Sequence, residues 1–281
     1  MNTYPVTTDT TFTALGAFWH RDSPQLLERA LNSVCQNSLL PHEIVLVQDG
    51  PVSSDLLKVV DDYDSIVPLR LIQLDENMGL GHAMNVGLKT IKTSHVIRFD
   101  ADDLSLSNRF DVMMAKFREG YDLVGSQVCE LNDPNSANTV RRVPKSIEEI
   151  SRYLRYRNPF NHMTVGFLNE AIKNVGGYPD IKLREDYALW AKCLASGYKM
   201  CNVEEILVEA TGGDNMIRRR GGFKNVLSEL KLQKLMLQLG IQSPISAIAY
   251  GSIRCLVCML PTFIRKHIYR MHLRGRVITA K

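Results

Sequence analysis

Apolar and polar positions follow two different rhythms along the first two thirds of the chain, and these predict strands and helices in turn. Short apolar runs predict strands at 12–19, 43–48, 69–74, 94–99 and 121–129. Apolar residues at helical spacing predict helices from Ser23-Pro24 onward and at 55–63, 79–90 and 106–119. Apolar strands that alternate with helices are typical of a parallel sheet with right-handed crossovers. We therefore expect an α/β fold with a mostly parallel, Rossmann-like sheet flanked by helices.

The later part of the chain is α+β in character. It predicts helices at 146–156, 184–196 and 222–239 and a strand at 201–209. Residues 243–264 form an apolar run of about the length that spans a bilayer, interrupted by Arg254 and Pro261. A basic, amphipathic stretch follows at 265–276.

Charge divides the chain into two unequal parts. Residues 231–281 contain nine Lys and Arg and no Asp or Glu, whereas residues 1–230 hold 25 basic and 30 acidic residues, a net charge of −5. This asymmetry indicates an anionic partner for the tail. A nucleic acid is one such partner, but no recognition motif supports it, so we expect none.

Three interpretations of residues 243–276 are open. A membrane-spanning helix fits the length, but Arg254 near its centre is costly. A buried terminal helix would not need a basic segment after it. A helical region that lies on an anionic membrane surface fits both the apolar run and the basic charge. We expect this peripheral arrangement and take the spanning helix as second choice.

Composition excludes several classes of protein. Hydrophobic residues make up 45% and charged residues 23% of the chain, which is ordinary for a globular protein. Six scattered cysteines are too few for a disulfide framework, and Cys255 and Cys258 lack the second pair that zinc prefers. Residues 1–11 are polar and lack the apolar region of a secretory signal, so we expect the protein to stay in a reducing cytoplasm.

Three carboxylates follow the fourth predicted strand, in the sequence Asp100-Ala101-Asp102-Asp103. Carboxylates this close repel each other unless a cation lies among them. In an extended chain Asp100 and Asp102 face the same side, and two such ligands together with substrate phosphates suit Mg²⁺ or Mn²⁺. Ligands of a parallel sheet bind beyond the carboxyl ends of its strands, where Gln48-Asp49-Gly50 also lies.

Two other interpretations of this acidic segment stay open. Asp102 or Asp103 can simply cap the helix that follows. The segment can also belong to a haloacid-dehalogenase-type phosphatase, whose nucleophilic Asp ends a strand. That motif requires Gly-Thr or similar after the second Asp, however, where this chain has Asp103-Leu104.

Four segments have an order and spacing that is far more specific than any one of them. They are Arg21-Asp22 before a helix, 43–51 (EIVLVQDGP), 77–88 (NMGLGHAMNVGL) and 98–103 (RFDADD), with Gly176-Gly177-Tyr178 and 184–190 (REDYALW) downstream. Together they cover roughly residues 10–210, about three quarters of the chain. In this the chain resembles the family 2 inverting glycosyltransferases of GT-A fold, especially bacterial O-antigen and exopolysaccharide members of the amylovoran type.

The resemblance implies roles for individual residues. Asp100 and Asp102 match the DxD motif, which holds Mn²⁺ or Mg²⁺ and the diphosphate and ribose of a nucleotide-sugar. Asp186, in the pair Glu185-Asp186, matches the usual general base, which deprotonates the acceptor hydroxyl. From the residues alone, this pair is equally explained as favourable charge in the first turn of a helix.

Further contacts are implied less directly. The resemblance places Gln48, Asp49, Asn77, Arg98 and Ala101 at the nucleotide-sugar, and His162 and Trp190 at the acceptor. Gln48-Asp49-Gly50-Pro51 departs from the family's Asp-Asp-Gly-Ser, and Met84 stands where the family often has Arg. The alternatives are a turn for Asp49, a structural histidine for His162 and core packing for Trp190.

The resemblance implies a metal-dependent, inverting hexosyltransferase. It would transfer galactose or glucose from a UDP-sugar to a saccharide on undecaprenyl diphosphate, such as GlcNAc-diphosphate-lipid, at the cytoplasmic face of the bacterial inner membrane. Residues 1–220 would form the catalytic domain, with a nucleotide-sugar half at about 10–130 and an acceptor half at about 131–220. Residues 221–281 would form a membrane-associating helical extension.

Two other functions stay open. A sugar-nucleotide pyrophosphorylase also uses a doubly wound sheet, but it needs a Gly-rich, basic phosphate loop that residues 12–24 lack. A non-catalytic membrane adaptor with a relict donor site is the second alternative.

Overall fold

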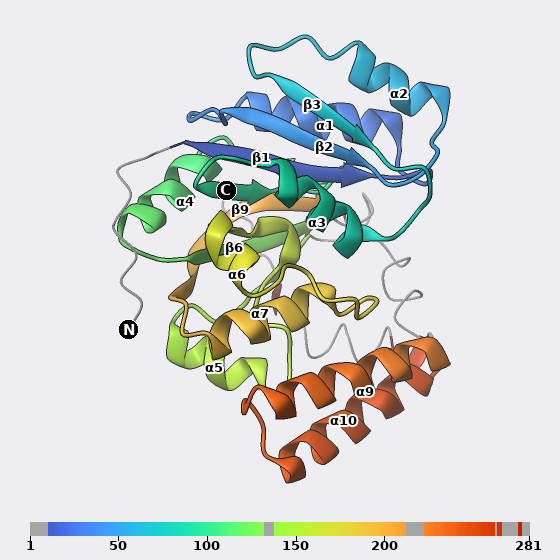
Figure 1. Cartoon of the computed structure of the whole chain (residues 1–281), viewed down its shortest axis with the longest axis vertical. Coiled ribbons are helices and arrows are strands. Elements are labelled where there is room, and N and C mark those ends of the chain that lie inside the picture. Colours follow the sequence, from blue (N-terminus) through green and yellow to red (C-terminus); the bar gives the residue numbers. More distant parts are fainter. Residues whose placement is uncertain (1–10, 132–137, 212–221, 262, 266–274, 277–281) are drawn as a thin grey trace.

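The computed structural model describes residues 11–131, 138–211, 222–261, 263–265 and 275–276. Within these residues the chain builds a mixed sheet of ten strands, flanked by helices (Figure 1). The strand order is β10-β7-β6-β8-β4-β1-β2-β3, with β9 beside β6 and β5 beside β9. The α/β fold expected from the sequence is confirmed.

Four strands of the N-terminal half pair in parallel, as predicted. They are β1 (Phe12–Phe18), β2 (Glu43–Gln48), β3 (Leu69–Gln73) and β4 (His95–Arg98). The helices of this half are α1 (Pro24–Cys35), α2 (Ser54–Asp61), α3 (Leu80–Thr90) and α4 (Arg109–Arg118). Because the strands are parallel, the segments that follow β1, β2 and β4 lie at one edge of the sheet.

Both faces of the parallel strands are buried, which explains their uninterrupted apolar sequences. On β2, Ile44 and Leu46 pack in a cluster with residues of α1, α2 and α4. Val45 and Val47 pack in a second cluster with residues of α3 and α7 (Glu185–Ala195). All four side chains are fully buried, as expected where alternate residues of a strand face two covered sides.

The second half of the sheet is mostly antiparallel, so the sheet as a whole is mixed. Its strands are β5 (Leu104–Ser105), β6 (Leu123–Leu131), β7 (Thr139–Arg141), β8 (Gly166–Leu168), β9 (Met200–Thr211) and β10 (Gly275–Arg276). Within the part of this half that the structure describes, β6 and β9 are the one pair of strands that run parallel. Strands β5, β7 and β8 have two or three residues each, which is too short for an alternating pattern to predict them. The other elements here are α5 (Ile147–Leu154), η1 (His162–Thr164) and α6 (Asn169–Asn174).

Two long helices, α9 (Phe223–Gln238) and α10 (Pro244–Met259), form a hairpin beside α5 and α7 (Figure 1). Ser243 accepts a hydrogen bond from the Ser246 amide at the start of α10, and the helix ends before Pro261. None of the helices within the described residues combines the length and the hydropathy that crossing a bilayer requires. Most of the basic stretch predicted at 265–276 lies outside the described residues.

Candidate active site

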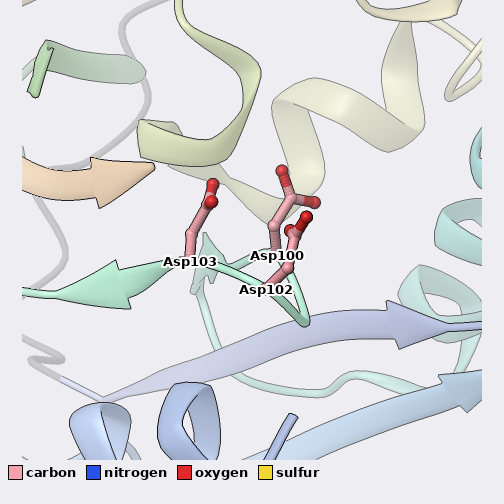
Figure 2. Close-up of side chains that lie close together, drawn as sticks. All are labelled: Asp100, Asp102 and Asp103. Atoms are coloured by element: carbon pink, nitrogen blue, oxygen red, sulfur yellow. The ribbon is translucent and has the colours of Figure 1, made fainter. Parts of the chain in front are cut away.

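The carboxylates of Asp100, Asp102 and Asp103 lie together where the chain leaves β4. Their oxygens come within 4.8 Å of one another, and Figure 2 shows Asp100 and Asp102 side by side, with Asp103 nearer to β5. Asp100 and Asp102 are partly exposed, whereas Asp103 is buried. The clustering predicted from the sequence is therefore present, and its oxygen ligands are of the type that Mn²⁺ and Mg²⁺ prefer.

Burial and the neighbouring acidic charges raise the pKa values of Asp102 and Asp103. Burial, followed by the charges of Asp100 and Asp22, raises the pKa of Asp102 to about 6. Burial and the charges of Asp100 and Asp102 raise the pKa of Asp103 well above its ordinary value. A divalent cation at the cluster would relieve this repulsion, so the residues present fit such an ion.

Two buried arginines lie beneath the acidic cluster. Arg98 is 1% exposed and forms an ion pair with Asp100, whose side chain is 26% exposed. Burial by itself lowers the pKa of Arg98, but the charges of Asp100, Tyr178 and Asp103 together with the hydrogen bond to Asp100 outweigh it and raise the pKa. Arg109 donates to the Arg98 carbonyl and, at 3.0 Å, to that of Met163, and burial together with the charge of Arg98 lowers its pKa to about 9. Arg98 thus neutralises the buried side of the cluster while the other side faces solvent.

The loop that carries the acids is also held from β9 and α1. Thr211 donates its main-chain amide to Asp103 Oδ1 at 2.9 Å and its hydroxyl to the Asp102 carbonyl. Arg29 donates to the same carbonyl at 3.3 Å. The side chain of Ala101 packs in the core, so Ala101 can offer only main-chain atoms to a ligand. Sequence reasoning missed Thr211, Arg29 and Arg109, because no local pattern marks contacts between distant segments.

Asp49 and Asn77 come together as predicted, but Asp49 holds a loop. Its carboxylate accepts hydrogen bonds from Asn77 Nδ2 at 3.0 Å, the Met78 amide at 2.7 Å and the Gly79 amide at 3.0 Å. Gly50 has a φ of 83°, and a Cβ there would lie 2.6 Å from the Asn77 nitrogen, so this close approach requires glycine. The interpretation of Asp49 as a structural turn residue thus describes its contacts, and a nucleotide contact stays a prediction.

Gln48 is likewise engaged within the protein. Its Nε2 donates to the Gly50 carbonyl at 2.9 Å, and its Oε1 accepts from Gln73 Nε2 at 3.0 Å. With both ends of the amide hydrogen-bonded and the residue 7% exposed, the predicted contact to a nucleobase would need Gln48 to change partners.

Glu185 and Asp186 lie in the first turn of α7. Asp186 accepts hydrogen bonds from Asn158 Nδ2 at 2.6 Å and from the Tyr187 amide at 2.8 Å. Burial and the charge of Asp186 raise the pKa of Glu185. A Cβ on Gly81 would lie 3.1 Å from the Glu185 Cβ, so the start of α3, after the loop held by Asp49, touches this turn.

His162 packs against Tyr178, a buried residue that the charges of Asp186 and Asp100 both reach. Its Nε2 is 3.0 Å from the hydroxyl of Tyr178, and its ring lies 5.4 Å from the Tyr178 ring. Burial, followed by the charge of Arg98, lowers the pKa of His162 well below its ordinary value, so the imidazole is neutral. A contact with an acceptor stays a prediction for this half-buried residue.

The prediction that Trp190 contacts an acceptor sugar needs correction. Trp190 is 0% exposed, and its ring packs against Phe160 at 5.5 Å and His162 at 6.1 Å. An indole without exposed surface cannot stack on a sugar, so Trp190 is part of the core, as the alternative interpretation held.

Known proteins are similar to this chain in sequence and in fold. The family model described as Glycosyl transferase family 2 matches residues 19–175. The UDP-Gal:alpha-D-GlcNAc-diphosphoundecaprenol beta-1,3-galactosyltransferase of Escherichia coli is 36% identical, over 94% of this chain and 96% of its own. The amylovoran biosynthesis glycosyltransferase AmsE of Erwinia amylovora is 32% identical, over 94% of this chain and all of its own.

A solved structure is similar to this chain in its fold. The structure of S. aureus TarS 1-349 in complex with UDP-GlcNAc has a TM-score of 0.68 at 18% identity and covers 93% of this chain and 76% of its own. The GT-A fold implied by the sequence motifs is therefore confirmed. With the family model matching more than half of the chain, and with relatives above 30% identity over nearly its whole length, this chain belongs to glycosyl transferase family 2.

Proposed function

We propose that this glycosyltransferase moves galactose or glucose, with inversion, from a UDP-sugar to a saccharide on a lipid diphosphate. The observation that carries the proposal is the pair of acidic sites at the end of β4 and the start of α7, where the charges of Asp100 and Asp186 both reach the buried Tyr178. The printed activity of the Escherichia coli relative, a galactosyl transfer from UDP-Gal to GlcNAc-diphosphoundecaprenol, supports the choice of donor and acceptor.

The donor side rests on the acidic cluster. Asp100 and Asp102 would hold Mn²⁺ or Mg²⁺, and when bound the cation supplies Lewis-acid stabilisation of the charge on the leaving UDP. Arg98 keeps the buried side of the cluster neutral through its ion pair with Asp100. Thr211 and Arg29 fix the main chain of the loop, so the carboxylates keep their mutual geometry as substrate enters.

The acceptor side rests on Asp186. An inverting displacement needs one base on the face of the sugar opposite the leaving group, and this base takes the proton of the attacking hydroxyl. The Asn158 amide at 2.6 Å fixes the orientation of the Asp186 carboxylate. Glu185 lies beside it, and its buried Oε2 has no hydrogen-bond partner among the described residues.

A membrane surface is the partner that fits α10. Its residues Ile245, Ile248, Leu256 and Met259 are 62–82% exposed on one face of the helix, whereas Gly251 packs against Gln233 of α9. Lys231 and Lys234 of α9 are exposed, and no acidic residue follows Glu229 in the sequence. Exposed apolar residues beside uncompensated basic charge suit an anionic bilayer surface, where a lipid-linked acceptor resides.

The test is transfer of labelled sugar from a panel of UDP- and GDP-sugars to a synthetic GlcNAc-diphosphate-lipid, with and without EDTA. We expect transfer from UDP-galactose or UDP-glucose only, an inverted product by NMR, and loss of activity in EDTA that Mn²⁺ or Mg²⁺ restores. Full activity in EDTA would remove the metal role. Release of UTP from UDP-sugar and pyrophosphate would indicate a pyrophosphorylase, and absence of transfer with weak UDP–Mn²⁺ binding would indicate an adaptor.

A further inference from the structure

Arg254 is a charged residue in the otherwise uncharged sequence of α10, and its guanidinium contacts other segments of the protein. Its Nε lies 2.7 Å from Oε1 of Glu229 on α9. Its Nη1 donates to the main-chain carbonyl of Tyr156 at 3.0 Å, and its guanidinium lies 5.0 Å from the ring centre of Tyr187 on α7. One side chain of the C-terminal hairpin therefore reaches three other segments.

Glu229 extends this contact to the start of α7. It is 0% exposed, and its second oxygen pairs with Arg184 Nε at 3.1 Å, while Gln233 donates to the first at 2.8 Å. Burial alone raises the pKa of Glu229, but the charges of Arg254 and Arg184 outweigh it and lower the pKa. The buried carboxylate is thus fully paired, which is the condition under which a buried charge is tolerated.

Arg184 is the residue directly before Glu185 and Asp186. Its predecessor Leu183 has a φ of 62°, a left-handed conformation that is strained for a residue with a side chain. Such a conformation persists where neighbouring contacts enforce it, and the ion pair of Arg184 with Glu229 is one of those contacts. The first turn of α7, which carries Asp186, is therefore linked to Arg254 by the ion pairs of Arg184 with Glu229 and of Glu229 with Arg254.

A second link to Arg254 runs through the end of α5. The carbonyls of Leu154, Arg155 and Tyr156 accept hydrogen bonds from Tyr187 at 2.6 Å, from Gln242 and from Arg254, respectively. These partners lie on α7 and in the C-terminal hairpin. Two residues after Tyr156, Asn158 donates to Asp186. Arg254 therefore contacts both segments that hold the Asp186 carboxylate.

We propose that Arg254 is a positioning residue for sugar transfer: it fixes the carboxylate of Asp186 through Glu229 and Arg184 on one side and through Tyr156 and Asn158 on the other. This inference rests on the proposed function, because it requires Asp186 to act as the base. It gives the hairpin a second task, since the helix with the exposed apolar face also sets the geometry of the acceptor side. A base displaced by about 1 Å can slow a reaction roughly 100-fold.

The test compares Arg254→Met with Lys145→Met, which removes an exposed cation paired with Glu204 at 3.2 Å. For Arg254→Met we expect kcat per UDP-binding site to fall roughly 10- to 100-fold, with the donor KM and binding to anionic vesicles unchanged. Lys145→Met should match the wild type in all three. Arg254→Lys keeps the charge beside Glu229 but cannot form all the contacts of the guanidinium, so it should fold and lose several-fold in kcat.

A background without the base separates positioning from general destabilisation. In Asp186→Asn, adding Arg254→Met or Arg254→Lys should lower the residual rate no further, whereas a structural defect would lower it by the same factor as in the wild type. This inference would be overturned by a folded Arg254 variant with wild-type kcat, or by an equal loss of rate in the wild-type and Asp186→Asn backgrounds. Neither result would affect the assignment of Asp186 as the base. Wild-type turnover by Asp186→Asn would overturn the base assignment and this inference with it.

Discussion

The loop after β4 and the first turn of α7 both present carboxylates, but their surroundings differ. In the loop, carboxylate oxygens of three acids lie within 4.8 Å of one another, and burial with the neighbouring acidic charges raises the pKa values of Asp102 and Asp103. In the turn, Asp186 receives two hydrogen bonds, from Asn158 and from the Tyr187 amide. Among the described residues, Arg98 alone forms an ion pair with the first group of acids, whereas the carboxylate of Asp186 is held by neutral donors. Under the proposed function, the first would take a cation and the second a proton.

Neutralising one acid at each site should have the largest effects and should separate the two roles. We expect Asp186→Asn to lower kcat about 10²- to 10⁴-fold while UDP–Mn²⁺ binding stays at the wild-type level. Asp102→Asn should instead lose UDP–Mn²⁺ binding. Calorimetric titration and transfer assays measure both quantities, with Asp61→Asn on the exposed end of α2 as control. Equal loss of UDP–Mn²⁺ binding in both variants would mean that the two sites do not have separate roles.

Removing the hydrogen bond to Asp186 sharpens the comparison further. Asn158→Ala leaves the carboxylate free to rotate, so we expect kcat to fall roughly tenfold, the equivalent of one hydrogen bond to a charged group. The KM for the donor should not change, because Asn158 does not touch the acidic cluster. Steady-state kinetics with both substrates varied provide the measurement, and a rise in donor KM would contradict the assignment.

The crowded acids should also give the metal-free protein an unusual pH dependence. Because the pKa of Asp102 is raised to about 6 in the fold, the folded state binds more protons than the unfolded state between about pH 4 and 6. Stability should therefore fall as the pH rises through this range, and Mn²⁺ at pH 7 should restore it. Asp102→Asn should stabilise the metal-free protein at pH 7 by roughly 1 to 3 kcal/mol. Thermal unfolding with and without Mn²⁺ checks this, and a stability that rises with pH to the same extent in both proteins would refute it.

The smallest effect is expected away from both sites. Trp190→Phe removes part of a fully buried ring, so it should destabilise the protein by roughly 1 to 2 kcal/mol. The KM for the acceptor should stay within twofold of the wild type, because the indole has no surface to offer a sugar. A large rise in acceptor KM in a stable variant would return Trp190 to the binding site.

The sequence by itself determined the parallel core and the acidic loop. Buried strands such as β2 are apolar on both faces, so their positions can be predicted from the local pattern, and the acids of residues 100–103 follow such a strand directly. The short strands β5, β7 and β8 were not predicted, because two or three residues are too few to show a periodic pattern in the sequence and their pairing partners lie in distant segments.

Only the tertiary structure decided which polar groups are free to act. In the sequence, Gln48 is a candidate for a base contact and Arg254 an interruption of an apolar run. In the fold, Gln48 is hydrogen-bonded at both ends, and Arg254 links α10 to α5, α7 and α9. The hydrophobic periodicity that indicates burial is a pattern of neighbouring residues in the chain, so it can be recognised in the sequence. The partner of a charge or an amide depends instead on which distant segments pack beside it.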